Sequence, residues 1–213
     1  ENKGMMGNFL WTLNQCRGRY IALCEGDDYW TDPYKLQKQV DFLDKNPEYV
    51  LCFHPVRILE PDGSLVDDYI TKVPLQYKTI HDLARYGNYI HTPSVVYRNV
   101  LDSLPDEMLH TPIGDFFLYM LLARHGKIQQ LNDVMAVYRH QSGSFSNLNN
   151  TIRGLKFMQT LYLIRSIMDN QFKDVSNILS ERIFIIFNGL LPDISYDDIQ
   201  RLRKENSKML DMI

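Results

Sequence analysis

The chain has 213 residues with 45% hydrophobic content, which suffices for one sizeable core, alone or with a helical appendage. Its formal net charge of −3 provides no basic field, so we expect no nucleic-acid partner. No stretch approaches the roughly 20 uninterrupted apolar residues of a membrane span. The three cysteines form no CxxC pair, which argues against a disulfide framework and favours a reducing, cytoplasmic location.

The first part of the chain alternates helix and strand signals. Residues 8–16 have apolar side chains at helical spacing, and a glycine soon after predicts the end of a short helix. Residues 20–24 form a continuous apolar run, which is typical of a buried strand in a mostly parallel sheet. Asp32 as N-cap and Pro33 at the first helical position predict a second helix, which ends at the Asn-Pro pair of residues 46–47.

The later segments predict an α/β region followed by a helical one. Residues 49–59 are β-rich and are followed by a strong turn at 61–64, which predicts an antiparallel excursion. We predict an α/β fold with a mostly parallel sheet in residues 1–148 and a helical C-terminal region in 149–213. The remaining predicted elements are helices over 79–86 and 115–125, strands over 94–97 and 135–138, and helices over 150–168, 175–187 and 196–210.

An acidic run directly follows the first predicted strand. Glu25, Asp27 and Asp28 flank Gly26, which has no side chain to obstruct a close approach. Ligands of open α/β sheets bind outside the carboxyl ends of strands. Three carboxylates in such a place repel one another unless a cation neutralises them, and their oxygens suit Mg²⁺ or Mn²⁺ bridging to phosphate. The other interpretation is a loop whose acidic residues only punctuate the turn and cap the next helix.

The run from Gly18 to Gln39 resembles family 2 glycosyltransferases of the GT-A fold, which carry a G-x-Y-I…D-x-D-D-x-W…P-x-K-L signature. The resemblance covers about residues 1–146. It implies transfer of a sugar from a nucleoside diphosphate to a hydroxyl acceptor, usually with inversion. Glu25 takes the first acidic place of the signature, where the family has Asp, and Asp27 the second. Asp27 is then the expected metal ligand with Glu25, and Asp28 supports the loop or the donor.

Upstream of the signature, Asn2, Gly4 and Asn8 match the family's N-x-G…N segment, which lies beside the nucleotide. They are therefore predicted to bind the donor. In the family, a first βαβα half of roughly 80 to 90 residues precedes this segment and holds the base and ribose, and we expect the chain to begin after it. Loss of that half would cripple donor binding.

Gly114 and Asp115 resemble the family's later G-D motif at a helix start, where the Asp is the general base. An acceptor hydroxyl is a poor nucleophile until a positioned carboxylate takes its proton. Placement at a helix start is expected to keep Asp115 ionised. An ordinary N-cap is the alternative role for the same residue.

The segment around Tyr138 resembles the family's Y-R-x-H ending of the catalytic domain, which can fold over the donor. Here His140 directly follows Arg139, and Gln141 takes the usual His place. We predict that His140 contacts the metal and that Arg139 pairs with the donor diphosphate. The shifted order leaves open whether His140 or Gln141 faces the metal.

Three residues are candidates for acceptor binding. Thr92 and Ser94 precede a predicted strand where the family places an acceptor-facing loop, and Trp30 could stack on a sugar face. Strand-edge hydroxyls need no such role, and aromatic side chains more often pack a helix on a sheet. The expected partners are a nucleoside-diphosphate sugar and a saccharide or lipid-linked acceptor.

Two other functional classes compete with the enzyme. A degenerate, non-catalytic transferase could bind a partner through the apolar faces of its C-terminal helices, which would also serve for packing, for a homodimer or for peripheral contact with the inner membrane. A nucleotidyltransferase shares the carboxylates but leaves the helix at Asp115 without an explanation. The transferase is therefore the preferred hypothesis.

Overall fold

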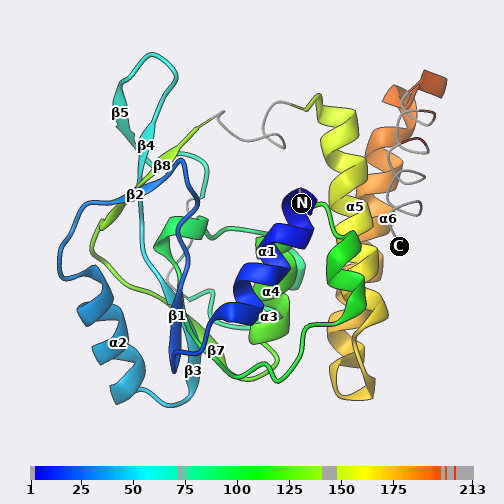
Figure 1. Cartoon of the computed structure of the whole chain (residues 1–213). Coiled ribbons are helices and arrows are strands. Elements are labelled where there is room, and N and C mark those ends of the chain that lie inside the picture. Colours follow the sequence, from blue (N-terminus) through cyan, green and yellow to red (C-terminus); the bar gives the residue numbers. More distant parts are fainter. Residues whose placement is uncertain are drawn as a thin grey trace.

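The computed structural model describes residues 3–71, 74, 76–140, 148–197, 200 and 204. An α/β half is followed by a pair of long helices, as Figure 1 shows. The predicted helix over 196–210 lies largely outside the described residues. The α-helices of the described residues are α1 (Gly4–Gln15), α2 (Lys35–Lys45), α3 (Ile80–Tyr86), α4 (Gly114–Leu122), α5 (Asn150–Ser166) and α6 (Lys173–Leu190).

The strands of the described residues form two mixed sheets, with the orders β1-β6-β3-β7 and β2-β8-β4-β5. In each sheet one neighbouring pair is parallel, β3 with β7 and β4 with β8, and the other pairs are antiparallel. The strands are β1 (Tyr20–Ala22), β2 (Tyr29–Trp30), β3 (Tyr49–Phe53), β4 (Arg57–Leu59), β5 (Leu65–Asp67), β6 (Val96–Arg98), β7 (Lys127–Gln130) and β8 (Ala136–Arg139).

The predicted class, α/β with a helical C-terminal part and consistent with a GT-A-like fold, is confirmed, but the sheet is not mostly parallel. β6 lies between β1 and β3 and runs antiparallel to both. The turn at 61–64 joins β4 and β5 as the predicted antiparallel excursion. Continuous apolar runs indicate burial on both faces of a sheet, but burial is compatible with either strand direction.

The start of α2 differs from the sequence expectation, whereas the start of α3 agrees with it. Asp32 is not the N-cap of α2, because Pro33 and Tyr34 form a turn before the helix and Tyr34 takes the N-cap place. Asp32 still accepts a hydrogen bond from the Tyr34 amide at 2.7 Å. At α3 the Thr79 and Asp82 side chains form a capping box, which fixes the start of that helix.

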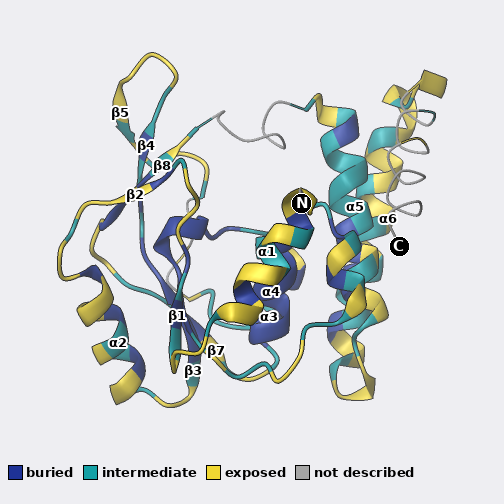
Figure 2. Cartoon of the chain, viewed as in Figure 1, coloured by how far each residue is buried: buried dark blue, intermediate teal, exposed yellow. Residues whose placement is uncertain are grey.

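The main core joins the α/β half to the helical pair. Helix α4 is buried along most of its length, as its dark blue colour in Figure 2 shows, and Phe116 and Phe117 are fully buried. Leu161 of α5 and Leu179 of α6 belong to the same hydrophobic cluster. The C-terminal helices therefore pack on the α/β half. The boundary at residues 148/149 stays a prediction. Within the described residues, no helix combines the length and apolar content that crossing a bilayer would require.

His54 is predicted to make stability depend on pH. Its ring is 2% exposed, Nδ1 donates to the Pro55 carbonyl at 2.8 Å, and Nε2 is buried without a partner among the described residues. Burial lowers the pKa of His54 from 6.5 to about 4. The unfolded chain then binds more protons between these values, so stability is complete above pH 6.5 and falls as the pH drops towards 4, by about 3 kcal/mol.

Urea unfolding between pH 4 and 7.5 would measure this effect. His54→Leu should lose this part of the pH slope, whereas His125→Leu, at an exposed histidine, should keep it. An unchanged slope in His54→Leu would contradict the assignment.

Candidate active site

The acidic loop, residues 25–28, is held between the two sheets. It leaves β1, whose pairing with β6 is extended by the bond from the Leu23 amide to the Val95 carbonyl at 3.1 Å. The loop closes as a turn, in which the Asp28 amide donates to the Glu25 carbonyl at 3.2 Å. Arg139 at the end of β8 clamps it from the other sheet, donating its amide to Asp28 Oδ1 at 2.8 Å and Nε to the Asp27 carbonyl at 3.1 Å. The loop is thereby fixed at the carboxyl end of β1.

The three carboxylates of this loop converge. One oxygen from each of Glu25, Asp27 and Asp28 lies within 4.8 Å of the others. Asp28 is 9% exposed, and its Oδ2 is buried with no hydrogen-bond partner among the described residues. Withdrawal from water, together with the neighbouring carboxylates, raises the pKa of Glu25 to about 7 and the pKa of Asp28 to about 6. Convergent carboxylates with an unpaired buried oxygen fit a hard divalent cation.

Asp115 lies in the first turn of α4, one residue after Gly114. Its Oδ2 accepts hydrogen bonds from Asn88 Nδ2 at 2.8 Å and from Thr92 Oγ1 at 3.4 Å. Its Oδ1 accepts the Phe116 amide at 2.7 Å, and Ile113 occupies the N-cap place, so Asp115 is not an ordinary N-cap.

Burial opposes the effect that the helix start is expected to have on the ionisation of Asp115. Burial raises the pKa of Asp115, although the hydrogen bonds from Asn88, the Phe116 amide and Thr92 oppose the rise. Desolvation outweighs the favourable helix terminus here. A carboxylate with a raised pKa is a better proton acceptor than an ordinary exposed one.

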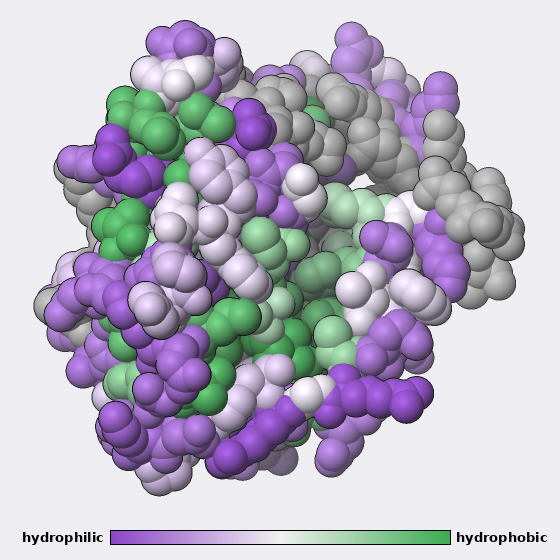
Figure 3. All heavy atoms as spheres, turned by 60° about the vertical axis from the view of Figure 1, so that its left-hand side comes forward, coloured by the Kyte–Doolittle hydropathy of each residue, from purple (hydrophilic) through white to green (hydrophobic). Residues whose placement is uncertain are grey.

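Asp115 and Glu25 line one hollow of about 650 Å³. Figure 3 shows a recess between the two halves of the molecule with apolar residues around it. Gly114 lies in this wall, and a Cβ there would come within 2.8 Å of the sulfur of Met6, so a larger residue would displace the Met6 side chain. The apolar wall residues include Met5, Met6, Phe9, Ile90, Ile113 and Phe157.

The predicted donor residues of α1 do not line this hollow. Gly4 begins the helix and is exposed, and Asn8 is exposed on its next turn, whereas their neighbours Met5 and Phe9 face the hollow. Asn2 lies outside the described residues. The donor roles of these three residues stay predictions.

His140 is not brought to the acidic loop. Its Nδ1 lies 2.9 Å from Glu60 Oε2 and 3.1 Å from the Tyr69 hydroxyl. Among the described residues, the group of side chains that could hold a metal ion consists of the three loop carboxylates and does not include His140. Gln141 lies outside the described residues, so the choice between these two side chains stays a prediction.

The three acceptor candidates have different surroundings. Thr92 lines the hollow and donates Oγ1 to Asp115, and its role in acceptor binding stays a prediction. Ser94 does not line the hollow: it is fully buried, its Oγ donates to the His91 carbonyl at 2.6 Å, and no acceptor can reach it in this conformation. Trp30 is 37% exposed and donates Nε1 to the Pro93 carbonyl at 3.0 Å, with Lys35 Nζ 4.5 Å from its ring centre. The ammonium covers part of the ring that a sugar would need.

Several residues of the hollow were not predicted from the sequence. Asn88 follows the glycine that ends α3, and the residues around it give no sequence signal for its hydrogen bond to Asp115. His91 forms a nearly buried pair with Asp68, with Nε2 and Oδ2 3.1 Å apart. Arg153 and Arg182 come from the C-terminal helices. All of these depend on contacts between segments that are distant in the chain.

Comparison with known proteins points to one family. The glycosyl transferase family 2 model matches residues 1–104, which include the acidic loop and Thr92. Through these residues, the chain is similar to glycosyl transferase family 2. The matched part ends before Asp115, so the role of Asp115 rests on its position in the hollow and on the motif resemblance.

The relatives that match this chain are longer proteins. Uncharacterized proteins of Mycobacterium tuberculosis and Mycobacterium bovis are 43% identical over 145 residues, which is 66% of this chain and 40% of theirs. The amylovoran biosynthesis glycosyltransferase AmsE of Erwinia amylovora is 25% identical over 150 residues, which is 70% of this chain and 53% of that protein. The chain thus spans about half or less of the relatives it matches.

Proposed function

We propose that this chain carries the catalytic centre of a glycosyltransferase that moves a sugar from a nucleoside diphosphate to a hydroxyl acceptor. The match of residues 1–104 to glycosyl transferase family 2 supports glycosyl transfer and implies a nucleotide-sugar donor and an acceptor. The observation that carries the proposal is the shared hollow: the acidic loop enters it through Glu25, and Asp115 lies in its wall. The charge of Asp115 contributes to the raised pKa of Glu25, so the two groups are close enough to act on one bound substrate.

Asp115 is the proposed general base. It takes the proton of the acceptor hydroxyl while the hydroxyl oxygen forms a bond to the anomeric carbon of the sugar. The bond from that carbon to the diphosphate oxygen breaks, and its electron pair leaves with the nucleoside diphosphate. Attack opposite to the leaving group gives inversion. Asn88 and Thr92 hold Asp115 Oδ2 from one side, which leaves the orientation of the carboxylate defined.

Glu25, Asp27 and Asp28 are the proposed ligands of Mn²⁺ or Mg²⁺. The donor set is all carboxylate oxygen, and the buried, unpartnered Oδ2 of Asp28 is the clearest mark of a place for a cation. A bound divalent ion would supply positive charge to the leaving diphosphate. Arg139, which bonds to Asp27 and Asp28, keeps the loop in the shape that such binding needs.

Release of nucleoside diphosphate from a panel of nucleotide sugars, with Mn²⁺ and with EDTA, tests this function. The assay uses the protein with any chain that precedes Glu1 in its reading frame. Turnover that depends on the metal and on an added hydroxyl acceptor would support the proposal. Failure to bind any nucleoside diphosphate in the presence of Mn²⁺ would favour the non-catalytic interaction module, to which the exposed Phe184 and Ile185 of α6 would be suited.

Asn88→Ala is expected to change the pH dependence of the reaction. The hydrogen bond from Asn88 lowers the pKa of Asp115, so its loss raises that pKa further and protonates the base at higher pH. The acidic limb of kcat/KM should therefore move to higher pH. The pH profile of Asn99→Ala, a remote variant that removes an exposed hydrogen bond to Gly18, serves as the control and should not move. An unshifted limb in Asn88→Ala would argue against Asp115 as base.

A further inference from the structure

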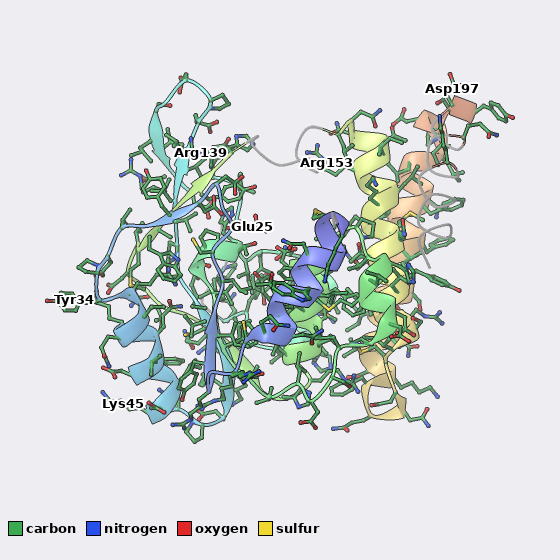
Figure 4. All side chains as sticks on the ribbon, in the orientation of Figure 1. Glu25, Tyr34, Lys45, Arg139, Arg153 and Asp197 are labelled. Carbon is green, nitrogen blue, oxygen red and sulfur yellow. The ribbon has the colours of Figure 1, made fainter. Side chains whose placement is uncertain are left out.

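The far side of the hollow from the acidic loop is cationic. Arg153 of α5 and Arg182 of α6 line the same hollow as Asp115 and Glu25. Figure 4 shows Arg153 on α5 and Glu25 on the segment after β1. One cavity is therefore lined both by carboxylates and by guanidinium groups from the two C-terminal helices.

Arg182 is held in place by contacts that do not neutralise it. Its Nη1 donates to the Ala84 carbonyl at 3.1 Å, and its guanidinium carbon lies 5.0 Å from the centre of the Phe157 ring. Gly87 makes room for it, because a Cβ there would lie 2.5 Å from Nη2. Burial lowers the pKa of Arg182 to about 10, which still leaves it charged at neutral pH.

Neither arginine forms an ion pair within the described part of the chain. Arg153 donates to the Asn150 side chain, and Arg182 to a backbone carbonyl. The ion pairs of the described residues involve other groups. A half-buried guanidinium without a counter-ion is unfavourable, and two of them at one hollow attract an anion. Guanidinium groups bind phosphate and carboxylate with paired hydrogen bonds.

We propose that Arg153 and Arg182 bind an anionic group of the acceptor, a phosphate or carboxylate, while its hydroxyl reaches Asp115. This inference rests on the proposed glycosyl transfer, because it names the class of acceptor for that same hollow. The acidic loop repels an anion from its own side, which directs the anionic end towards the C-terminal helices. The apolar side chains of Met6, Phe9 and Phe157 cover the space between the two ends.

Binding of simple probes tests the site without donor or turnover. Hexyl phosphate, hexanoate and hexanol are titrated by calorimetry in EDTA, so that no metal can bridge an anion to the acidic loop. We expect hexyl phosphate or hexanoate to bind and hexanol to bind much more weakly. The tighter of the two anions identifies the acceptor group as phosphate or carboxylate. Equal binding of hexanol would overturn the proposal.

Variants locate the anion. Arg182→Gln and Arg153→Gln should each weaken binding of the anionic probe by about tenfold or more. Arg165→Gln, at an exposed position of α5 outside the hollow, should leave it unchanged. Arg153→Gln keeps the test decisive if Arg182→Gln fails to fold, since the Arg182 side chain also packs on Phe157. Unchanged binding in a folded arginine variant would overturn the proposal.

One further variant separates this site from the donor site. Asp27→Asn should weaken metal-dependent binding of nucleoside diphosphate but leave binding of the anionic probe in EDTA intact. If Asp27→Asn also abolished binding of the probe, the anion would occupy the donor side and the acceptor assignment would be wrong. If the probe binds at the arginines but no transfer is found, the anion site survives and only the proposed function fails.

Discussion

Asp115→Asn is expected to lower kcat by about 10²- to 10⁴-fold, the range that general-base catalysis contributes. The amide keeps the size of the carboxyl group and can still accept one hydrogen bond, so the fold of α4 should survive. It cannot take the proton of an acceptor hydroxyl. The apparent affinity for nucleoside diphosphate should change little, because the acidic loop is untouched.

Steady-state kinetics of this variant would be measured over a range of pH, beside Asp102→Asn as the control. Asp102 is exposed and lies outside the hollow, so its neutralisation removes the same charge without touching the site. A kcat within a few-fold of the starting protein in Asp115→Asn would remove Asp115 from the mechanism. A fall of equal size in both variants would point to the net charge instead.

Asp27→Asn is expected to weaken Mn²⁺-dependent binding of nucleoside diphosphate by about 10- to 100-fold or more. The structural reason is the convergence of three carboxylates within 4.8 Å, from which one charged ligand is removed. The same change relieves repulsion, because the charge of Asp27 contributes to the raised pKa values of Glu25 and Asp28. In EDTA the unfolding temperature should therefore not fall.

Calorimetric titration with Mn²⁺ and thermal unfolding in EDTA measure the two effects of Asp27→Asn. Asp41→Asn is the matched control, since Asp41 is exposed on α2, outside the acidic loop, and its carboxylate accepts a hydrogen bond from Gln37. Metal-dependent binding that survives in Asp27→Asn would contradict a metal site here. A lowered unfolding temperature in EDTA would show that the loop carboxylate serves folding rather than a cation.

Local sequence patterns sufficed for the elements that carry the acidic loop. The apolar run ending at Cys24 predicted the strand, the acidic residues after it predicted the loop, and the apolar spacing around Leu36 and Val40 predicted the helix beyond it. Each depends on residues within a few positions of one another, where side-chain period and turn chemistry act directly. The hairpin turn at 61–64 succeeded for the same reason.

The sequence patterns failed where a small polar residue is compatible with more than one local structure. Asp32 has the composition of an N-cap, but the turn through Tyr34 displaces it. Ser94 carries a hydroxyl at a strand edge, yet it is fully buried in the packing between the sheet and α2. The exposure of a polar side chain depends on which segments pack over it. The residues next to it in the sequence do not determine that packing.

By itself, the sequence determined the six described α-helices, the acidic loop at a strand end and the motif that singles out Asp115, but it gave no sign of the strands β2 and β7. Only the tertiary structure decided that β6 inserts antiparallel between β1 and β3, that Asn88 holds Asp115, and that Arg153 and Arg182 face the same hollow. Strand pairing and cavity walls are built from residues far apart in the chain, and a single sequence has no local period that encodes such contacts.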